Sequence, residues 1–337
     1  MASPTTATAT AGPENDVAMA MPNATIATSS AVYPMRFASW TRDAIRARRS
    51  STGSDSTPAT LRRMRAVVAA GDRVRALGFG PGITHVMAVV NLSPESRVRH
   101  SVVDSPEAAL TRAREYRDLG ASIIDLGAQS SHFENRPLTP AEETDRLLPA
   151  LELLVADGFV VSCDTWKPEV AEAAVRAGAA IVNDTGGLRD PRMVELVRTS
   201  GAAAVAMHIE GENPLAVADR ALDAGRPEVV AELLGARVAA LRADGITGPL
   251  LVDPGLSINY RSDYEAYGQL QLATIRGLAA LRAIGEPVLI PVPRKADTHR
   301  MLAYLTLSIE YGADVLRVHD VAAACDLVSL LGRRLGG

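Results

Sequence analysis

After a glycine-rich break at residues 78–82, short apolar runs alternate regularly with segments of helical period as far as the C-terminal end of the chain. The eight apolar runs are residues 85–90, 122–126, 159–163, 180–182, 203–207, 249–252, 287–292 and 314–318. Helical segments follow them near residues 105–119, 140–156, 167–177, 191–200, 226–243, 264–284, 297–312 and 321–334. This alternation constrains the fold strongly, because strands joined by helices pair in parallel through right-handed crossovers.

The number of strand-helix units distinguishes a closed sheet from an open one. Eight units in about 250 residues is typical of a TIM barrel. No glycine-rich dinucleotide turn follows the first apolar run. We therefore predict an α/β protein with a TIM (β/α)8 barrel at residues 81–337, and the alternative is a doubly wound parallel sheet.

Residues 1–80 have a different composition. Residues 1–34 are dominated by Ala, Thr, Ser, Pro and Met without helical or strand period, and residues 36–75 hold ten arginines against three aspartates. We predict a low-complexity, arginine-rich extension that is largely disordered, with a helical pattern near residues 61–70. Its arginines indicate a solvated leader rather than a patch for an anionic partner. A chain that starts near Gly80 is expected to keep its fold and its ligand affinity.

The charge balance argues against polyanionic partners. The chain has 35 basic and 39 acidic residues and a formal charge of -4, so we expect neither nucleic-acid nor membrane binding. No window approaches the roughly 18 apolar residues of a membrane span, and the first 32 residues contain no Lys or Arg to start a secretory signal. We expect a cytoplasmic protein whose two cysteines, Cys163 and Cys325, are reduced and buried.

Polar and charged residues collect at the predicted carboxyl ends of the strands, where TIM barrels carry their chemistry. They are Asn91, Asp125, Asp164, Asn183 with Asp184, His208, Asp253, Arg294 with Lys295, and Arg317 with His319 and Asp320. Each residue alone could cap a helix or close a turn. Capping does not require Lys, Arg or His at the same rim, so the set as a whole indicates a functional site.

Lysine is nearly absent from the chain, which has 33 arginines but only Lys167 and Lys295. Lys167 precedes a helix start and is interpreted as solvated. Lys295 follows an apolar strand, where a retained ammonium group suggests a ligand atom. Acidic and amide side chains with a few cations suit a ligand that has a donor-rich heterocycle at one end. Arg317 and His319, next to the last helix, would hold an anionic group at its other end.

Eight motifs follow one another at these strand ends over residues 85–337. They are Met87-Ala-Val-Val-Asn91-Leu-Ser-Pro-Glu-Ser96, Ala121-Ser-Ile-Ile-Asp125-Leu-Gly127, Val161-Ser-Cys-Asp164-Thr-Trp-Lys167, Ile181-Val-Asn183-Asp184, Met207-His208-Ile-Glu-Gly211, Asp253-Pro-Gly255, Arg294-Lys295 and Arg317-Val-His319-Asp320-Val321. In order and spacing they resemble the motifs of the dihydropteroate synthase family of pterin-binding TIM barrels. The chain is identified as a divergent member.

The resemblance implies a site and a reaction. The implied substrate-binding residues are Asp164, Asn183, Met207, Asp253, Lys295, Arg317 and His319. In the family, the residues that correspond to Asp164, Asn183 and Asp253 bind the aminopyrimidine edge of the pterin. The Lys295 match reaches the carbonyl and a ring nitrogen of the pterin, and the Arg317 match stacks on its ring.

The implied catalytic residues are Asp164, Lys295 and Arg317, and Asn91 is the implied ligand of a magnesium ion. Asn91, Arg317 and His319 would serve the pyrophosphate. The implied reaction condenses 6-hydroxymethyl-7,8-dihydropterin pyrophosphate with 4-aminobenzoate or a related amine and releases pyrophosphate. A homodimer is also expected.

Two loops depart from the family pattern. Where the family's first loop continues as D-S-F-S-D-G-G, the chain reads Glu95-Ser96-Arg97-Val98-Arg99-His100. The second loop, E-S-T-R-P-G in the family, aligns with Gln129-Ser130-Ser131-His132-Phe133-Glu134, so His132 replaces an arginine. The pocket residues are retained while the loop residues differ. A non-catalytic pterin-binding or regulatory homologue is therefore the alternative to a synthase, and a methyltetrahydrofolate methyltransferase is a third hypothesis.

Overall fold

The computed structural model describes residues 71–96, 98–130, 132, 135–217, 226–258, 264–293, 298–332 and 334–335. All of them belong to one compact unit, Thr57–Gly337. The predicted disorder of residues 1–70 and the helical pattern near 61–70 lie outside the described residues.

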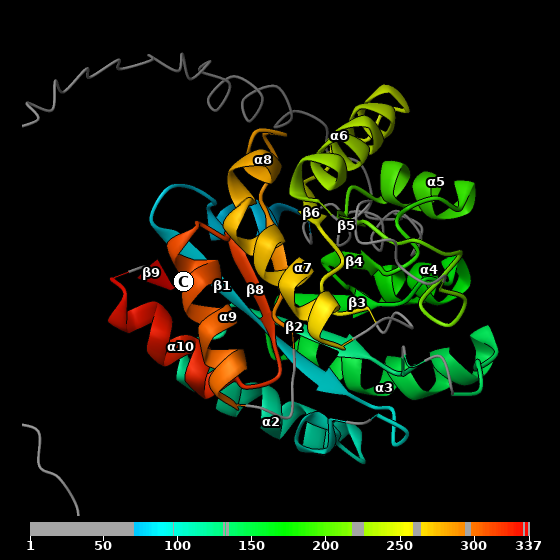
Figure 1. Cartoon of the computed structure of the whole chain (residues 1–337). Coiled ribbons are helices and arrows are strands. Elements are labelled where there is room, and N and C mark those ends of the chain that lie inside the picture. The colour runs from blue at the N-terminus through cyan, green and yellow to red at the C-terminus, as the bar shows by residue number, and fades with distance from the viewer. Residues whose placement is uncertain are drawn as a thin grey trace, which may run out of the picture. The chain divides into compact units, whose positions relative to one another are not determined.

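Eight parallel strands form a barrel, as the sequence predicted (Figure 1). They are β1 (Ile83–Asn91), β2 (Ile123–Gly127), β3 (Val161–Asp164), β4 (Ile181–Asp184), β5 (Ala203–Met207), β6 (Leu250–Asp253), β7 (Leu289–Pro291) and β8 (Val315–Val318). The strands neighbour one another in the order β6-β5-β4-β3-β2-β1-β8-β7. A parallel bridge between Val252 and Val288 brings β6 and β7 together. The doubly wound alternative is excluded, because it requires an open sheet.

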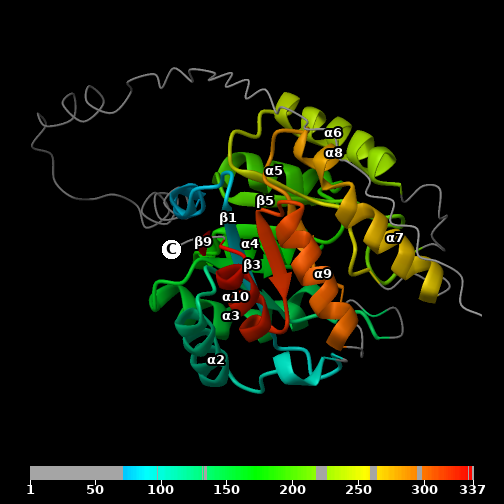
Figure 2. The same ribbon diagram turned by 60° about the vertical axis from the view of Figure 1, so that its left-hand side comes forward.

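Helices follow the strands along the chain and cover the barrel. They are α2 (Pro106–Leu119), α3 (Pro140–Ala156), α4 (Pro168–Ala177), α5 (Pro191–Ser200), α6 (Pro227–Ala243), α7 (Tyr264–Arg276), α8 (Leu278–Arg282), α9 (Thr298–Glu310) and α10 (Val321–Leu330). α10 contacts both α2 and α9, so the first and last units of the barrel are neighbours (Figure 2). Helices α2 to α6 begin with proline, whose fixed φ suits the first helical position.

Two predicted helices differ from the structure at their ends. The segment predicted as one helix over 264–284 is interrupted at Gly277, where a Cβ would lie 2.4 Å from Cβ of Pro227 on α6. The last helix ends at Leu330 instead of continuing to 334. Gly332 has a φ of 71°, typical of a residue that follows a helix. The chain then forms β9 (Arg334–Leu335), which pairs with the start of β1.

Residues 71–79 cover the end of the barrel at which β1 starts (blue helix in Figure 2). Residues 71–77 are helical, and Val74 is completely buried. Val74 packs in one apolar cluster with Met87, Ile123, Ala180, Ile181, Ala203, Val205, Leu251, Leu289 and Val315. Leu77 and Phe79 lie against the same cluster. The sequence assigned these residues to the extension, whereas here they pack as part of the barrel.

The barrel interior becomes polar toward the carboxyl ends of the strands. Side chains alternate between the two faces of a strand, so Ile123 and Asp125 on β2 share the inner face, as do Ile181 and Asn183 on β4. Ile123 and Ile181 lie in the apolar cluster, whereas Asp125 and Asn183 contact each other further along the strands. The apolar layer therefore supports a polar layer, in which the predicted site residues lie.

Candidate active site

One guanidinium and two carboxylates meet in the polar layer of the barrel. Arg317 on β8 donates from Nε to Oδ2 of Asp125 at 2.7 Å and from Nη2 to Oδ2 of Asp164 at 2.5 Å. The Asp125 side chain is fully buried, while those of Asp164 and Arg317 are 21% and 16% exposed. A ligand can therefore reach Asp164 and Arg317, whose orientations are fixed by their ion pair.

Asp125 is the centre of this hydrogen-bond network. Its Oδ1 accepts from Oγ of Ser162 at 2.6 Å and from Nδ2 of Asn183 at 3.3 Å, in addition to the Arg317 contact at Oδ2. Sequence reasoning placed Asp125 at a strand end but gave it no role. The signal that could have assigned it is strand alternation, because Asp125 is an inward-facing position on β2.

Asp253 and Asp184 illustrate two different uses of a strand-end carboxylate. Asp253 on β6 is buried, and its Oδ1 accepts the backbone N–H of Gly255 at 2.6 Å. Asp184 on β4 accepts the backbone N–H groups of Gly186 at 2.7 Å and Leu188 at 2.9 Å. For Asp184 the explanation by turn closure holds. Among the described residues, the Asp253 carboxylate accepts its hydrogen bond through Oδ1, from Gly255.

Gly255 makes the position of Asp253 possible. Its φ of 73° is a left-handed conformation that favours glycine. A Cβ at this position would lie 2.1 Å from the carbonyl oxygen of His208. Only glycine fits at this position, and its conformation directs the backbone N–H of Gly255 to the Asp253 carboxylate.

Burial changes the acidity of the site. Desolvation raises the pKa of Asp253 to about 7, against the hydrogen bond from Gly255 and the attraction of Arg317. Desolvation also raises the pKa of Asp164, opposed by Arg317 and reinforced by the Asp125 carboxylate. Three carboxylates thus surround one guanidinium, which favours a ligand that presents N–H donors.

A second group of polar side chains lies where β1 and β8 end. Nδ2 of Asn91 donates to Oγ of Ser101 at 2.9 Å, and Nδ1 of His319 lies 2.9 Å from the same oxygen. His319 is two residues before the first residue of α10, where the Asp320 side chain caps the backbone N–H of Ala323 at 3.1 Å. The remaining backbone N–H groups at the start of the helix favour an anion. This group, Asn91, Ser101 and His319, is called the anion end of the site below.

Gly127 joins the anion end to the carboxylates. It pairs with Asn91 on one side and with Asp164 on the other. A Cβ on Gly127 would meet Cβ of Asp164 at 3.5 Å and Oδ1 of Asn91 at 3.8 Å. Asn91 at one end of the site and Asp164 at the other are therefore both neighbours of Gly127.

Met207 lies on the apolar side of the site. It ends β5 and packs with Ile209, Ile258, Tyr267 and Leu270 in a separate apolar cluster. Its backbone partner across the sheet is Asp253. The predicted substrate-binding residues lie on the four neighbouring strands β3 to β6, on β8 and on the turn after β8, and they are Asp164, Asn183, Met207, Asp253, Arg317 and His319. Lys295 lies outside the described residues.

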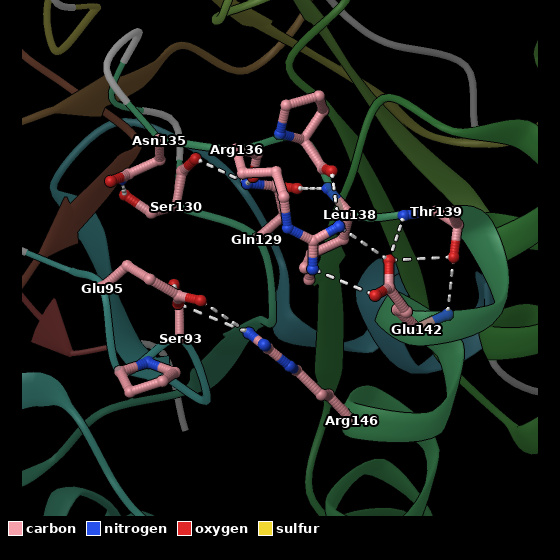
Figure 3. Close-up of polar contacts among 12 residues, drawn as sticks. Ser93, Glu95, Gln129, Ser130, Asn135, Arg136, Leu138, Thr139, Glu142 and Arg146 are labelled. Atoms are coloured by element: carbon pink, nitrogen blue, oxygen red, sulfur yellow. Dashed lines mark hydrogen bonds and ion pairs between the residues drawn. The ribbon is translucent and has the colours of Figure 1, made fainter.

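The second loop is held closed by its own residues (Figure 3). Oε1 of Gln129 accepts the backbone N–H of Leu138 at 2.6 Å, and its Nε2 donates to the carbonyl of Arg136 at 3.4 Å. Nδ2 of Asn135 donates to Oγ of Ser130 at 2.6 Å. These contacts join the start of the loop to its end. Residues 131, 133 and 134 of this loop lie outside the described residues.

The first loop is tied to α3. Glu95 accepts from Oγ of Ser93 at 2.7 Å and pairs with Nη1 of Arg146 at 3.2 Å (Figure 3). Nη1 of Arg99 donates to the carbonyl of Pro94 at 2.9 Å. Both loops that differ from the family pattern therefore carry contacts made by their own side chains. Arg97 lies outside the described residues.

The Lys167 side chain is largely buried, so its interpretation as a solvated residue is wrong. Its ammonium group forms an ion pair with Glu143 on α3, and the two side chains are 12% and 0% exposed. Lys167 also lies over the ring of Trp166, with Nζ 4.9 Å from the ring centroid. The loop after β3 turns this side chain inward toward α3, which residue spacing alone does not indicate.

Cys163 and Cys325 are free and buried, as expected. Within the part of the chain that the structure describes, no helix has the length and apolar character of a membrane span. No cluster of three or more His, Cys, Asp or Glu side chains in the same part could hold a metal ion.

Comparisons with known proteins agree with this geometry. Residues 87–319 match the family model described as pterin binding enzyme. The dihydropteroate synthase of Bacillus subtilis is 30% identical over 266 residues, which cover 75% of this chain and 89% of the relative. The dihydropteroate synthase of Mycobacterium leprae is 32% identical over 271 residues, covering 73% and 92%.

Solved structures give the same result. The dihydropteroate synthase of Thermus thermophilus in complex with 4-aminobenzoate has a TM-score of 0.61 at 34% identity, covering 74% of this chain and 93% of that one. The same enzyme in complex with 6HMPPP has a TM-score of 0.59 at 33% identity, covering 74% and 92%. The dihydropteroate synthase of Burkholderia cenocepacia complexed with 7,8-dihydropteroate has a TM-score of 0.61 at 28% identity, covering 74% and 90%.

Proposed function

Because the chain belongs to the family of pterin-binding enzymes, we propose that it is a transferase of the dihydropteroate synthase type. It condenses 6-hydroxymethyl-7,8-dihydropterin pyrophosphate with 4-aminobenzoate or a related amine. The amine nitrogen forms a bond to the methylene carbon, the bond from that carbon to the pyrophosphate oxygen breaks, and the amine releases a proton. The complexes of its relatives with 4-aminobenzoate, 6HMPPP and 7,8-dihydropteroate support these substrates.

One observation carries the proposal: Asp164, Asn183 and Arg317 share a buried hydrogen-bond network, and Asp253 lies beside them in the polar layer. The aminopyrimidine edge of a pterin presents parallel N–H donors, which a carboxylate accepts in pairs. Desolvation strengthens such pairs. The excess of carboxylates matches the donor-rich edge.

The charged groups of the site also stabilise the charges that develop during the reaction. As the pyrophosphate leaves, positive charge develops on the methylene carbon, and the ionised carboxylates of Asp164 and Asp253 stabilise it. At the other end, His319 and the N-terminus of α10 stabilise the negative charge on the pyrophosphate. Asn91 and Asp164 are the neighbours of Gly127 on the two adjacent strands, so one substrate can contact both ends of the site.

Magnesium would be held at the anion end. Nδ2 of Asn91 is used by Ser101, and Oδ1 is the atom of Asn91 nearest Gly127. Mg²⁺ takes one or two protein oxygens and completes its coordination with phosphate oxygens and water. A single amide oxygen therefore fits this ion, which supplies charge neutralisation to the pyrophosphate when bound.

We also propose that the protein is a homodimer and acts in the cytoplasm. Leu233 on α6 and Leu330 on α10 are exposed apolar side chains on different helices. Sedimentation analysis tests the oligomeric state, and cell fractionation tests the location.

Turnover of the pure protein tests the proposal. Incubation with the dihydropterin pyrophosphate and 4-aminobenzoate, with magnesium present, should release pyrophosphate in step with product. Omission of the amine provides the control for simple hydrolysis. Pterin binding without any pyrophosphate release from a panel of aromatic amines would favour the non-catalytic homologue, which the synthase relatives do not favour.

A further inference from the structure

Two residues at or beside the anion end, His100 and Ser101, differ from the family pattern. Aligned from Glu95 onward, the two glycines of the family's first loop fall at His100 and Ser101. Both lie in a short 3-10 helix, η2 (Arg99–Ser101), directly after the first loop. Side chains therefore stand here where the family pattern has none.

Ser101 is built into the site. Its side chain is completely buried, and its Oγ donates to the carbonyl of Val98 at 3.0 Å. The same oxygen accepts from Asn91 at 2.9 Å and lies 2.9 Å from Nδ1 of His319. Ser101 thus fixes Asn91 and His319 relative to each other.

His100 stands beside His319. The ring centroids are 6.3 Å apart and the ring planes are nearly perpendicular, at 82°. The His100 backbone is held from outside, because Nη1 of Arg112 on α2 donates to its carbonyl at 2.6 Å. Its side chain remains exposed, so the imidazole is available to a ligand while its backbone is fixed.

The neighbouring arginine does not take this position. Arg99 donates to the carbonyl of Pro94 and so contacts the first loop. Of the basic side chains in η2, the His100 imidazole is the one that lies against His319. Two adjacent imidazoles can each donate an N–H to a bound diphosphate.

We propose that His100 is an additional diphosphate-binding residue and that Ser101 is a positioning residue for Asn91 and His319. This inference rests on the proposed function only in naming the diphosphate as that of the pterin substrate. With His100 and Ser101, the anion end is a preorganised site for two linked phosphates. The leaving group is then bound both from the turn after β8 and from η2. His100 does not contribute to the affinity of a ligand that lacks phosphate.

Calorimetric titration of the full chain with inorganic pyrophosphate and magnesium tests the proposal, with a 6-hydroxymethylpterin as the ligand that lacks phosphate. His100→Ala should weaken pyrophosphate binding about 10-fold, since a hydrogen bond to a charged group is lost. Pterin affinity should be unchanged. His100→Gln, which keeps an N–H donor, should recover most of the loss. Ser101→Gly should weaken pyrophosphate binding as well, and in turnover it should raise KM for the pterin pyrophosphate more than it lowers kcat.

Separate outcomes distinguish this inference from the proposed function. Equal pyrophosphate affinity in the wild type and His100→Ala would overturn the inference, and pterin binding would still stand. An equal loss of pterin and pyrophosphate binding in His100→Ala would also overturn it, because it would show general damage to the site. A His100-dependent pyrophosphate site in a protein that binds no pterin would support the inference and refute the proposed function.

Discussion

Asp125 and Arg317 are 192 positions apart in the sequence and are joined by a 2.7 Å ion pair between Oδ2 and Nε inside the barrel. The carboxylate of Asp125 has its partners within the protein, on β3, β4 and β8. Through these hydrogen bonds Asp125 orients Asn183 and Arg317, which are both predicted to contact the ligand. Asp125 therefore acts on the ligand through its neighbours and is a positioning residue.

Replacing Asp125 should destabilise the protein. Asp125→Ala leaves the largely buried Arg317 with Asp164 as its remaining carboxylate partner in this network. Breaking an ion pair whose carboxylate is buried costs up to about 3 to 5 kcal/mol. Urea unfolding should show a loss of this order. Asp118→Ala on the exposed side of α2 is the matched control and should have little effect. A change below about 1 kcal/mol for Asp125→Ala would contradict the central role of this residue.

Asp253 should determine pterin affinity. Asp253→Ala removes a buried acceptor and leaves the ligand's donors unpaired, so the affinity should fall about 10-fold to 100-fold. Calorimetric titration with a pterin measures the change. Unaltered affinity would refute the pterin assignment of this pocket.

Pterin binding should depend on pH through the same residue. The pKa of Asp253 is raised to about 7, and only its ionised form accepts two hydrogen bonds from the ligand. Affinity should therefore rise as pH increases through about 7 and fall below it, by at most about 10-fold per pH unit for one proton. Asp253→Asn should reduce this dependence. A pH-independent affinity in the wild type would contradict the assignment.

The stability of the ligand-free protein should change in the opposite direction. Because burial raises the pKa of Asp253 above its value in the unfolded chain, the folded state binds more protons between about pH 4 and about pH 7. This contribution to the free energy of unfolding is complete below about pH 4 and is lost as pH rises through about 7. Comparison of wild type with Asp253→Asn over this range isolates it, since the variant carries no titratable group at this position.

Removing residues 71–79 should destabilise the barrel. A chain that starts at Gly71 keeps Val74, Leu77 and Phe79 and is the matched control. A chain that starts at Gly80 loses Val74, Leu77 and Phe79 from the apolar cluster, at a cost of about 2 to 5 kcal/mol. The packing of Val74 thus revises the expectation that the shorter chain behaves like the full one. Equal thermal midpoints of the two truncated chains would restore that expectation.

Local signals explain why the sequence predicted most of the fold. Helix α3 occupies the predicted residues 140–156, because Thr139 and Glu142 form a capping box that is visible in the sequence. The ion pair of Lys167 with Glu143 depends on how α3 packs beside β3, and no local pattern shows it. The same reason applies to Asp125, whose partners lie on other strands. The strand-end positions could be predicted, but the hydrogen bonds that connect them could not.

The second loop should limit the use of 4-aminobenzoate. His132 replaces an arginine of the family pattern, and an imidazole lacks the fork of N–H donors with which a guanidinium holds a carboxylate. We expect weak turnover with 4-aminobenzoate, and we expect that His132→Arg alone does not restore it.

The loop's path is set by Gln129, which joins its start to Leu138, and by Asn135, whose backbone N–H donates to the carbonyl of His132 at 2.9 Å. The His132 side chain is buried in this loop, so a longer arginine cannot take the same position without a change in the loop. Steady-state kinetics with a series of aromatic amines test this, and efficient wild-type turnover at low 4-aminobenzoate concentration would show that the altered loop supports the ordinary second substrate.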